Sequence, residues 1–144
     1  MTLATEPLAV RRSRSERMLE PALALGGLAA ATLALHVRDP HVAHSWGVCP
    51  LYALTGVYCP GCGALRGVND LGDGHLDAAA SSNLLLVLAL PFALWFLARW
   101  TWGRWTGREV ALLPTVPRAV TIGLVALVVV FTVARNLPGS PLAP

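Results

Sequence analysis

The three cysteines are the residues of this chain whose type and spacing could carry chemistry. Cys49, Cys59 and Cys62 all lie within residues 49–63, CPLYALTGVYCPGCG, the segment called here the cysteine loop. Nine residues separate the first cysteine from the second, and two separate the second from the third. The prolines and glycines among them are expected to prevent a regular helix. This clustering favours a shared chemical role for the three thiols.

One hypothesis for the cysteines is redox chemistry. The Cys59–Cys62 pair has the CxxC spacing that lets two thiols form a disulfide and that lowers the pKa of the attacking thiol. Cys59 and Cys62 would then be the catalytic redox pair of a thiol-disulfide exchanger, with Cys49 as the resolving thiol. However, the sequence lacks the βαβ pattern that accompanies thioredoxin-like sites. A purely structural disulfide, or cysteines that pack as small apolar side chains, therefore remain alternatives.

A metal site is the second hypothesis. Three thiolates and one imidazole form the Cys₃His tetrahedron of structural zinc sites, which makes zinc the candidate cofactor. The candidates for the fourth ligand are the four histidines, none at a diagnostic spacing: His36, His41, His44 and His75. Covalently attached haem is disfavoured because Gly63, and not histidine, follows Cys62.

Two polar residues are expected to support the cysteines. Arg66 follows Cys62 by four residues, so the two could share a helix face on which the guanidinium stabilises a thiolate or binds an anionic headgroup. The alternative is an interfacial arginine that reaches toward water. Asn83 begins an apolar run and is expected to form a hydrogen bond at the membrane surface, for example to the turn that carries the cysteines. No catalytic triad, phosphate-binding loop or carboxylate pair is present, so an enzymatic role is not favoured.

Composition indicates a membrane protein. Of 144 residues, 55% are hydrophobic and 13% charged, and the mean hydropathy is +0.58, outside the range of ordinary soluble domains. The basic residues flank apolar runs and form no stripe with interleaved aromatics, which argues against nucleic-acid binding. The expected partners are the lipid bilayer and another membrane protein.

The predicted fold is an all-α integral membrane protein with three transmembrane helices, at about residues 18–37, 83–102 and 118–135. Runs of this length cross a hydrocarbon core of about 30 Å at about 1.5 Å per residue. Residues 1–17 form a basic segment and residues 18–144 a single membrane domain. Within that domain, residues 38–82 hold the cysteine loop and a short interfacial or re-entrant helix after it. A cleaved signal peptide is the alternative for the first run, but the apolar stretch continues well beyond Ala29–Ala31.

Punctuating residues predict details of these helices. Gly72 and Gly74 should end the short helix, and Asp73 or the turn after it should cap a new helix near His75. Pro91 is expected to kink the second span. An aromatic belt is predicted from four tryptophans near the end of that span: Trp95, Trp100, Trp102 and Trp105.

The arginines predict the orientation in the cell membrane. Eight of them lie in the N-terminal segment and around the connector between the second and third spans: Arg11, Arg12, Arg14, Arg17, Arg99, Arg104, Arg108 and Arg118. The positive-inside rule then places the N-terminus and the connector in the cytoplasm, and the cysteine loop and C-terminal tail outside.

Read in order, several motifs resemble those of a family of small bacterial membrane proteins of unknown function, DUF2752. They are Cys49-Pro50, Leu54-Thr55-Gly56, Cys59-Pro60-Gly61-Cys62-Gly63 and Arg66, followed by Gly74, Ala79 and Asn83. The chain departs from the family pattern at Leu65, where threonine is usual, and at Leu84, where proline is usual. The resemblance implies a helical integral membrane protein and no established activity. We therefore expect an accessory or structural role, with thiol-disulfide exchange as the alternative.

Overall fold

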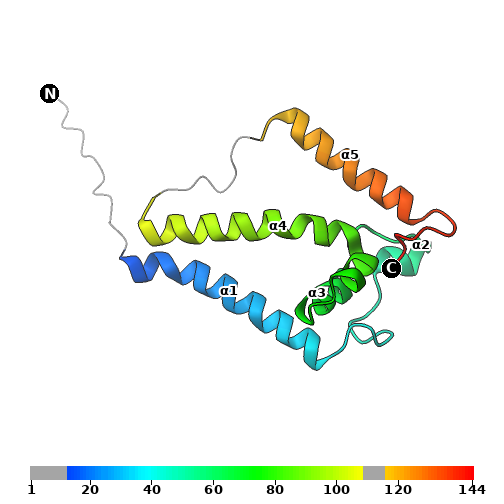
Figure 1. The fold of residues 1–144 in the computed structure, drawn as a ribbon, viewed down its shortest axis with the longest axis horizontal. Coiled ribbons are helices and arrows are strands. Elements are labelled where there is room, and N and C mark those ends of the chain that lie inside the picture. The colour runs from blue at the N-terminus through cyan, green and yellow to red at the C-terminus, as the bar shows by residue number, and fades with distance from the viewer. Residues whose placement is uncertain (1–12, 109–115) are drawn as a thin grey trace.

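The computed structural model describes residues 13–108 and 116–144, and within them the chain is helical without strands (Figure 1). Three helices are long and apolar enough to cross a membrane: α1 (Arg14–Val37), α4 (Leu76–Thr106) and α5 (Arg118–Arg135). Two short helices, α2 (Pro50–Thr55) and α3 (Ala64–Gly72), lie between α1 and α4. The predicted all-α fold, with three spans and a short helix after the cysteine loop, is confirmed. Most of the basic segment 1–17 and part of the connector fall outside the described residues.

Helix α1 begins at a capping box. The Ser13 hydroxyl accepts from the Glu16 backbone N–H, and the Glu16 carboxylate accepts from the Ser13 N–H at 2.8 Å, so two N–H groups at the helix start are satisfied. The same end of α1 is joined to the end of α4, where Arg104 donates to Glu20 at 2.5 Å and its carbonyl accepts from Arg17 at 3.2 Å. These contacts fix the two helices at the end opposite the cysteines.

The helices are packed unevenly. Helix α3 packs against α4 and α1, and α1 packs against α4. Helix α5 stands apart from this group along most of its length and meets the rest of the chain at its C-terminal end, beside α2 (Figure 1). The attachment of α5 therefore depends on its contacts with the cysteine loop.

One prediction for the cysteine loop is wrong, because the loop contains the regular helix α2. Pro50 occupies the start of this helix, where its missing N–H needs no partner. Gly56 ends the helix after six residues with φ of 70°, the left-handed conformation that glycine adopts readily. Proline and glycine here define the two ends of a helix and do not prevent one.

The interruption of α4 is at Asn83, which was not predicted, and Pro91 lies inside the helix after it. Asn83 has φ of −161° and ψ of 96°, which are not helical, and its Oδ1 accepts the Leu86 N–H at 2.9 Å. Asn83 thus acts as the N-cap of the longer, apolar part of α4. The predicted start near His75 is confirmed, but Asp73 does not cap the helix, since its carboxylate lies 3.1 Å from Nε2 of His36.

Candidate functional site: a three-thiol cluster

The structure brings the three cysteines together. Sγ of Cys59 lies 3.2 Å from Sγ of Cys62 and 3.5 Å from Sγ of Cys49, and all three sulfur atoms lie within 4.8 Å of one another. All are free thiols and half-buried. We call Cys49, Cys59 and Cys62 the three-thiol cluster.

Local structure explains why these side chains converge. Cys49 is the residue before α2, so its thiol lies at the N-terminal end of that helix. Cys59 and Cys62 lie in one tight turn, in which the Cys62 N–H donates to the Cys59 carbonyl at 3.1 Å. Gly63 follows with φ of 79° and starts α3. Helix α2 and the residues after it thus lead the chain away from Cys49 and back, so that the turn with Cys59 and Cys62 lies beside Cys49.

A fully buried arginine holds the backbone of this turn. Arg135, at the C-terminal end of α5, has none of its surface exposed. One terminal nitrogen donates to the carbonyl of Cys59 at 3.0 Å and to that of Pro60 at 3.3 Å, and the other donates to the carbonyl of Cys62 at 3.0 Å. The guanidinium also lies 5.0 Å from the ring centre of Phe131. A single side chain therefore binds the backbone of both cysteines of the CxxC motif.

Two asparagines complete the attachment. Nδ2 of Asn83, which is 2% exposed, donates to the carbonyls of Pro60 and Cys62 at 2.9 and 3.0 Å, confirming the predicted bond to the cysteine turn. Asn136 Oδ1 accepts the Tyr58 N–H at 2.8 Å, and Asn136 Nδ2 donates to the Tyr58 carbonyl at 2.9 Å. The turn is therefore held from α4 on one side and from the end of α5 on the other.

Sequence reasoning missed Arg135 and Asn136. Both end an apolar run, where polar residues ordinarily mark the point at which a span leaves the membrane. Their distance in sequence from the cysteines hid their role, since Arg135 lies 73 residues or more from the carbonyls it binds. An arginine next to an asparagine at the end of a run was the only available signal.

The surroundings shift the pKa values of two of the thiols in opposite directions. The pKa of Cys49 is lowered to about 7, first by the backbone N–H of Tyr52 in α2 and then by the thiols of Cys59 and Cys62. The pKa of Cys62 is raised to about 12, mainly by burial and then by its hydrogen bonds to the other two thiols.

The four candidate histidines have separate positions. Nε2 of His36 lies 3.1 Å from a carboxylate oxygen of Asp73. Nε2 of His41 likewise lies 2.9 Å from a carboxylate oxygen of Asp70. His75 precedes α4 and is exposed. His44, with a positive φ of 63°, lines the same pocket as Cys49 and Cys62, although its ring nitrogens are not part of the three-thiol cluster. His44 is therefore the predicted histidine best placed to become a fourth ligand.

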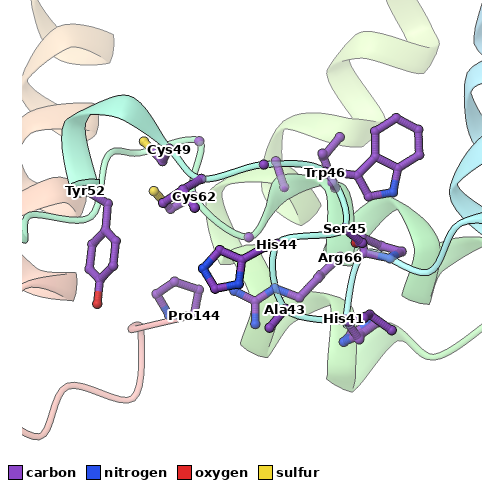
Figure 2. A pocket seen from close by; sticks show the side chains of 18 of the residues that line it. His41, Ala43, His44, Ser45, Trp46, Cys49, Tyr52, Cys62, Arg66 and Pro144 are labelled. Carbon is purple, nitrogen blue, oxygen red and sulfur yellow. The ribbon is translucent and has the colours of Figure 1, made fainter. Parts of the chain in front are cut away.

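Beside the cluster is a pocket of about 570 Å³. Figure 2 shows its labelled side chains, with Cys49 and Cys62 toward one end, His41 toward the other, and His44 between them in this view. Arg66 also lines the pocket from the first turn of α3. The predicted helix face shared by Cys62 and Arg66 is not formed, because α3 begins at Ala64, after Cys62, but both residues border one cavity.

Comparison with known proteins agrees with the expected resemblance. Residues 49–97 match the model of a family described as a protein of unknown function, DUF2752. The match covers the cysteine loop, α3 and most of α4, and ends before Arg135. Neither the curated proteins nor the solved structures contain a match.

Proposed function

We propose that this chain is a small membrane protein whose three-thiol cluster holds a soft metal ion of the zinc class, in an accessory or structural role. The observation that carries the proposal is the convergence of three free sulfur atoms within 4.8 Å on a backbone fixed by buried polar side chains. Thiolates at this spacing are the donor set preferred by zinc and by other soft cations.

The distances favour coordination over a bridge. Two sulfur ligands at about 2.3 Å from a tetrahedral zinc lie about 3.8 Å apart. The separations of 3.2 and 3.5 Å are shorter than that value by about 0.6 and 0.3 Å, and the third pair, Cys49 and Cys62, lies within 4.8 Å. A disulfide requires about 2.05 Å between the sulfur atoms, so either pair would have to approach by more than an ångström. The odd number of cysteines also suits three ligands better than one bridge.

The charges around the cluster support the same reading. Three thiolates and one divalent cation carry a net charge of −1, which is costly to bury without a nearby cation. The guanidinium of Arg135 lies against the backbone of Cys59 and Cys62 and supplies a positive charge there. The fourth position would face the pocket, where His44 makes no side-chain hydrogen bond among the described residues.

The test is metal stoichiometry on the full-length chain, purified in detergent and fully reduced. Cobalt is the probe, because thiolate-to-cobalt charge-transfer absorption reports sulfur ligands directly. We expect one cobalt per chain, displaced by zinc, with binding lost in Cys49→Ser, Cys59→Ser and Cys62→Ser. His44→Ala should weaken binding or alter the spectrum, whereas His75→Ala, outside the pocket, serves as the matched control. Absence of charge-transfer absorption in the reduced wild-type chain would refute the proposal.

The second candidate is thiol-disulfide exchange, and the position of Cys59 favours it. Cys59 is close to both other thiols, so a Cys49 thiolate could attack Cys59 Sγ in a Cys59–Cys62 disulfide. The Cys49–Cys59 bond would form, and Cys62 would leave as a thiolate that takes up a proton. A partner dithiol or disulfide protein would have to supply or accept the two electrons.

Trapping of a mixed disulfide distinguishes thiol-disulfide exchange from metal binding. An exchanger forms a mixed disulfide with its partner when Cys59→Ser or Cys62→Ser removes one thiol, and a non-reducing gel detects that species. An impermeant maleimide applied to intact cells separates the two as well: labelling that appears only after a reductant indicates a disulfide, and labelling that appears only after a chelator indicates a metal. If neither variant ever forms a mixed disulfide, the exchanger hypothesis fails.

A further inference from the structure

Arg66 is a charged residue in the pocket without a partner. Its side chain is half-buried and forms no ion pair or hydrogen bond within residues 13–108 and 116–144. The neighbouring acids of α3 are already engaged: Asp70 binds His41 and Ser82 at 2.9 Å each, and Asp73 binds His36. Among the described residues, no acidic side chain therefore forms an ion pair with this guanidinium.

We propose that the pocket of about 570 Å³ beside the three-thiol cluster binds a phosphate-type oxyanion, with Arg66 as its principal ligand. A guanidinium presents parallel N–H donors that match two oxygens of a phosphate. This inference goes beyond the proposed metal site and does not rest on it, because Arg66 is not one of the proposed metal ligands.

Further donors lie in the same cavity. Leu65 and Arg66 are in the first turn of α3, and neither backbone N–H donates to an acceptor among the described residues. The positive end of a helix dipole favours an anion at such N–H groups. The imidazole of His44 borders the same space, and in the metal-free chain its N–H can donate to an anion. The pocket is thus lined by Arg66, by the start of α3 with its two unpaired N–H groups and by His44, and Pro144 also borders it.

Two sources share this ligand chemistry. The residues that line the pocket lie in the loop after α1, in α2 and at the start of α3. These segments are at the end of the molecule where α1 ends and α4 begins (Figure 1), the level at which lipid phosphates lie if these helices span the bilayer. Trp46 in the pocket wall is 42% exposed, as is typical of interfacial aromatics. A phospholipid headgroup and free inorganic phosphate therefore both fit.

The experiment uses the full chain in detergent, reduced and free of metal. One arm measures binding of inorganic phosphate by equilibrium dialysis, and the other measures retention of phosphatidylglycerol against a phosphate-free galactolipid by native mass spectrometry. Arg66→Gln should weaken binding about tenfold or more, the effect of losing a charged hydrogen bond. Arg118→Gln, an exposed arginine at the other end of α5, removes the same charge and should leave binding unchanged.

The two binding measurements distinguish a phospholipid headgroup from free inorganic phosphate. Retention of phosphatidylglycerol alone assigns a lipid headgroup, and binding of inorganic phosphate assigns a soluble anion. Binding in neither arm, or equal binding by the two arginine variants, overturns the proposal.

A second measurement uses the wild-type chain, so its result does not depend on whether the arginine variants fold. Phosphate should slow maleimide modification of Cys49, which lines the pocket, whereas chloride at equal ionic strength should not. No protection by phosphate or by phosphatidylglycerol would also overturn the proposal. Cobalt binding, measured separately on the same preparations, shows whether the metal site succeeds or fails independently.

Discussion

At the scale of single residues, Cys49 and Cys62 differ in acidity although their sulfur atoms belong to one cluster. The thiolate is the form that reacts with electrophiles. With a pKa lowered to about 7, Cys49 becomes a thiolate as the pH rises through neutrality, whereas Cys62, raised to about 12, stays protonated. The cause is position, since Cys49 lies at the N-terminus of α2, next to the Tyr52 N–H, and Cys62 is half-buried in the turn, where loss of solvent raises its pKa.

This difference predicts the order of modification in the metal-free protein. The rate of iodoacetamide modification of Cys49 should increase from pH 6 to about pH 8 and then level off, because its thiolate fraction saturates above its pKa of about 7. Cys62 should remain slow throughout that range. Peptide mapping by mass spectrometry measures both rates on one unmutated chain. Faster modification of Cys62 than of Cys49 at pH 7 would contradict the prediction.

Arg135 is the residue on which the site depends most. Arg135→Gln removes the positive charge and the pair of terminal nitrogens that donate to the carbonyls of Cys59 and Cys62. Because outer-shell residues of metal sites typically contribute 10- to 100-fold in affinity, we expect cobalt affinity to decrease at least about tenfold. Arg135→Lys keeps the positive charge but has a single amine in place of the two terminal nitrogens, so its cobalt affinity should be intermediate.

Thermal unfolding in detergent separates lost affinity from lost structure in these variants. Removal of a buried charged donor should destabilise Arg135→Gln by about 2 kcal/mol or more even without metal. Arg118→Gln is the control for the change in net charge. If Arg135→Gln binds cobalt as tightly as the wild-type chain, the turn does not need this arginine, and our account of the site is wrong.

At the scale of elements, the close approach of α3 to α4 positions the cysteine turn. A Cβ atom on Gly63 would lie 2.2 Å from the backbone carbonyl oxygen of Ser82 and 2.9 Å from Cβ of Pro144. Backbone at such a distance cannot move aside as a flexible side chain can. Glycine at this position therefore permits both the positive φ of 79° and the contact between the two elements.

Gly63→Ala and Gly74→Ala form a matched pair that tests this contact. Both glycines have positive φ, 79° and 80°, but nothing lies within 4 Å of a Cβ atom on Gly74. Gly74→Ala should therefore cost only the left-handed conformation, about 1 kcal/mol. Gly63→Ala should cost clearly more and also weaken cobalt binding, because the turn must move away from α4. Equal destabilisation by the two variants, measured by thermal unfolding, would show that the contact is unimportant.

Elements also show what sequence could and could not predict. Hydropathy defined the three spans closely, because the cost of exposing a polar backbone in lipid leaves a long apolar run few alternatives to a helix. The ends of α2 and the break at Asn83 were missed, since each depends on one residue's local hydrogen bonds. The convergence of the three thiols was anticipated from their spacing. The role of Arg135 was not, because it depends on how α5 meets the loop in three dimensions.

At the scale of the whole molecule, α5 is the most loosely attached of the long helices. Apart from its C-terminal end, its apolar side chains are exposed, as expected of a helix that faces lipid. Arg135 and Asn136 bind the cysteine turn, so the C-terminal end of α5 and the cysteine loop share one side of the membrane. A marker at the C-terminus therefore also reports the side of the loop.

We propose that this side is extracytoplasmic, from the distribution of arginines at the ends of the spans. The arginines around the start of α1 and between α4 and α5 outnumber the three on the side of the cysteine loop, which are Arg38, Arg66 and Arg135. The positive-inside rule keeps the richer side in the cytoplasm. Alkaline phosphatase fused after Pro144 should be active, whereas green fluorescent protein inserted between α4 and α5 should fluoresce. The reverse pattern would place the three-thiol cluster in a reducing compartment, where free thiols persist without metal and the predicted chelator-dependent labelling of intact cells would not occur.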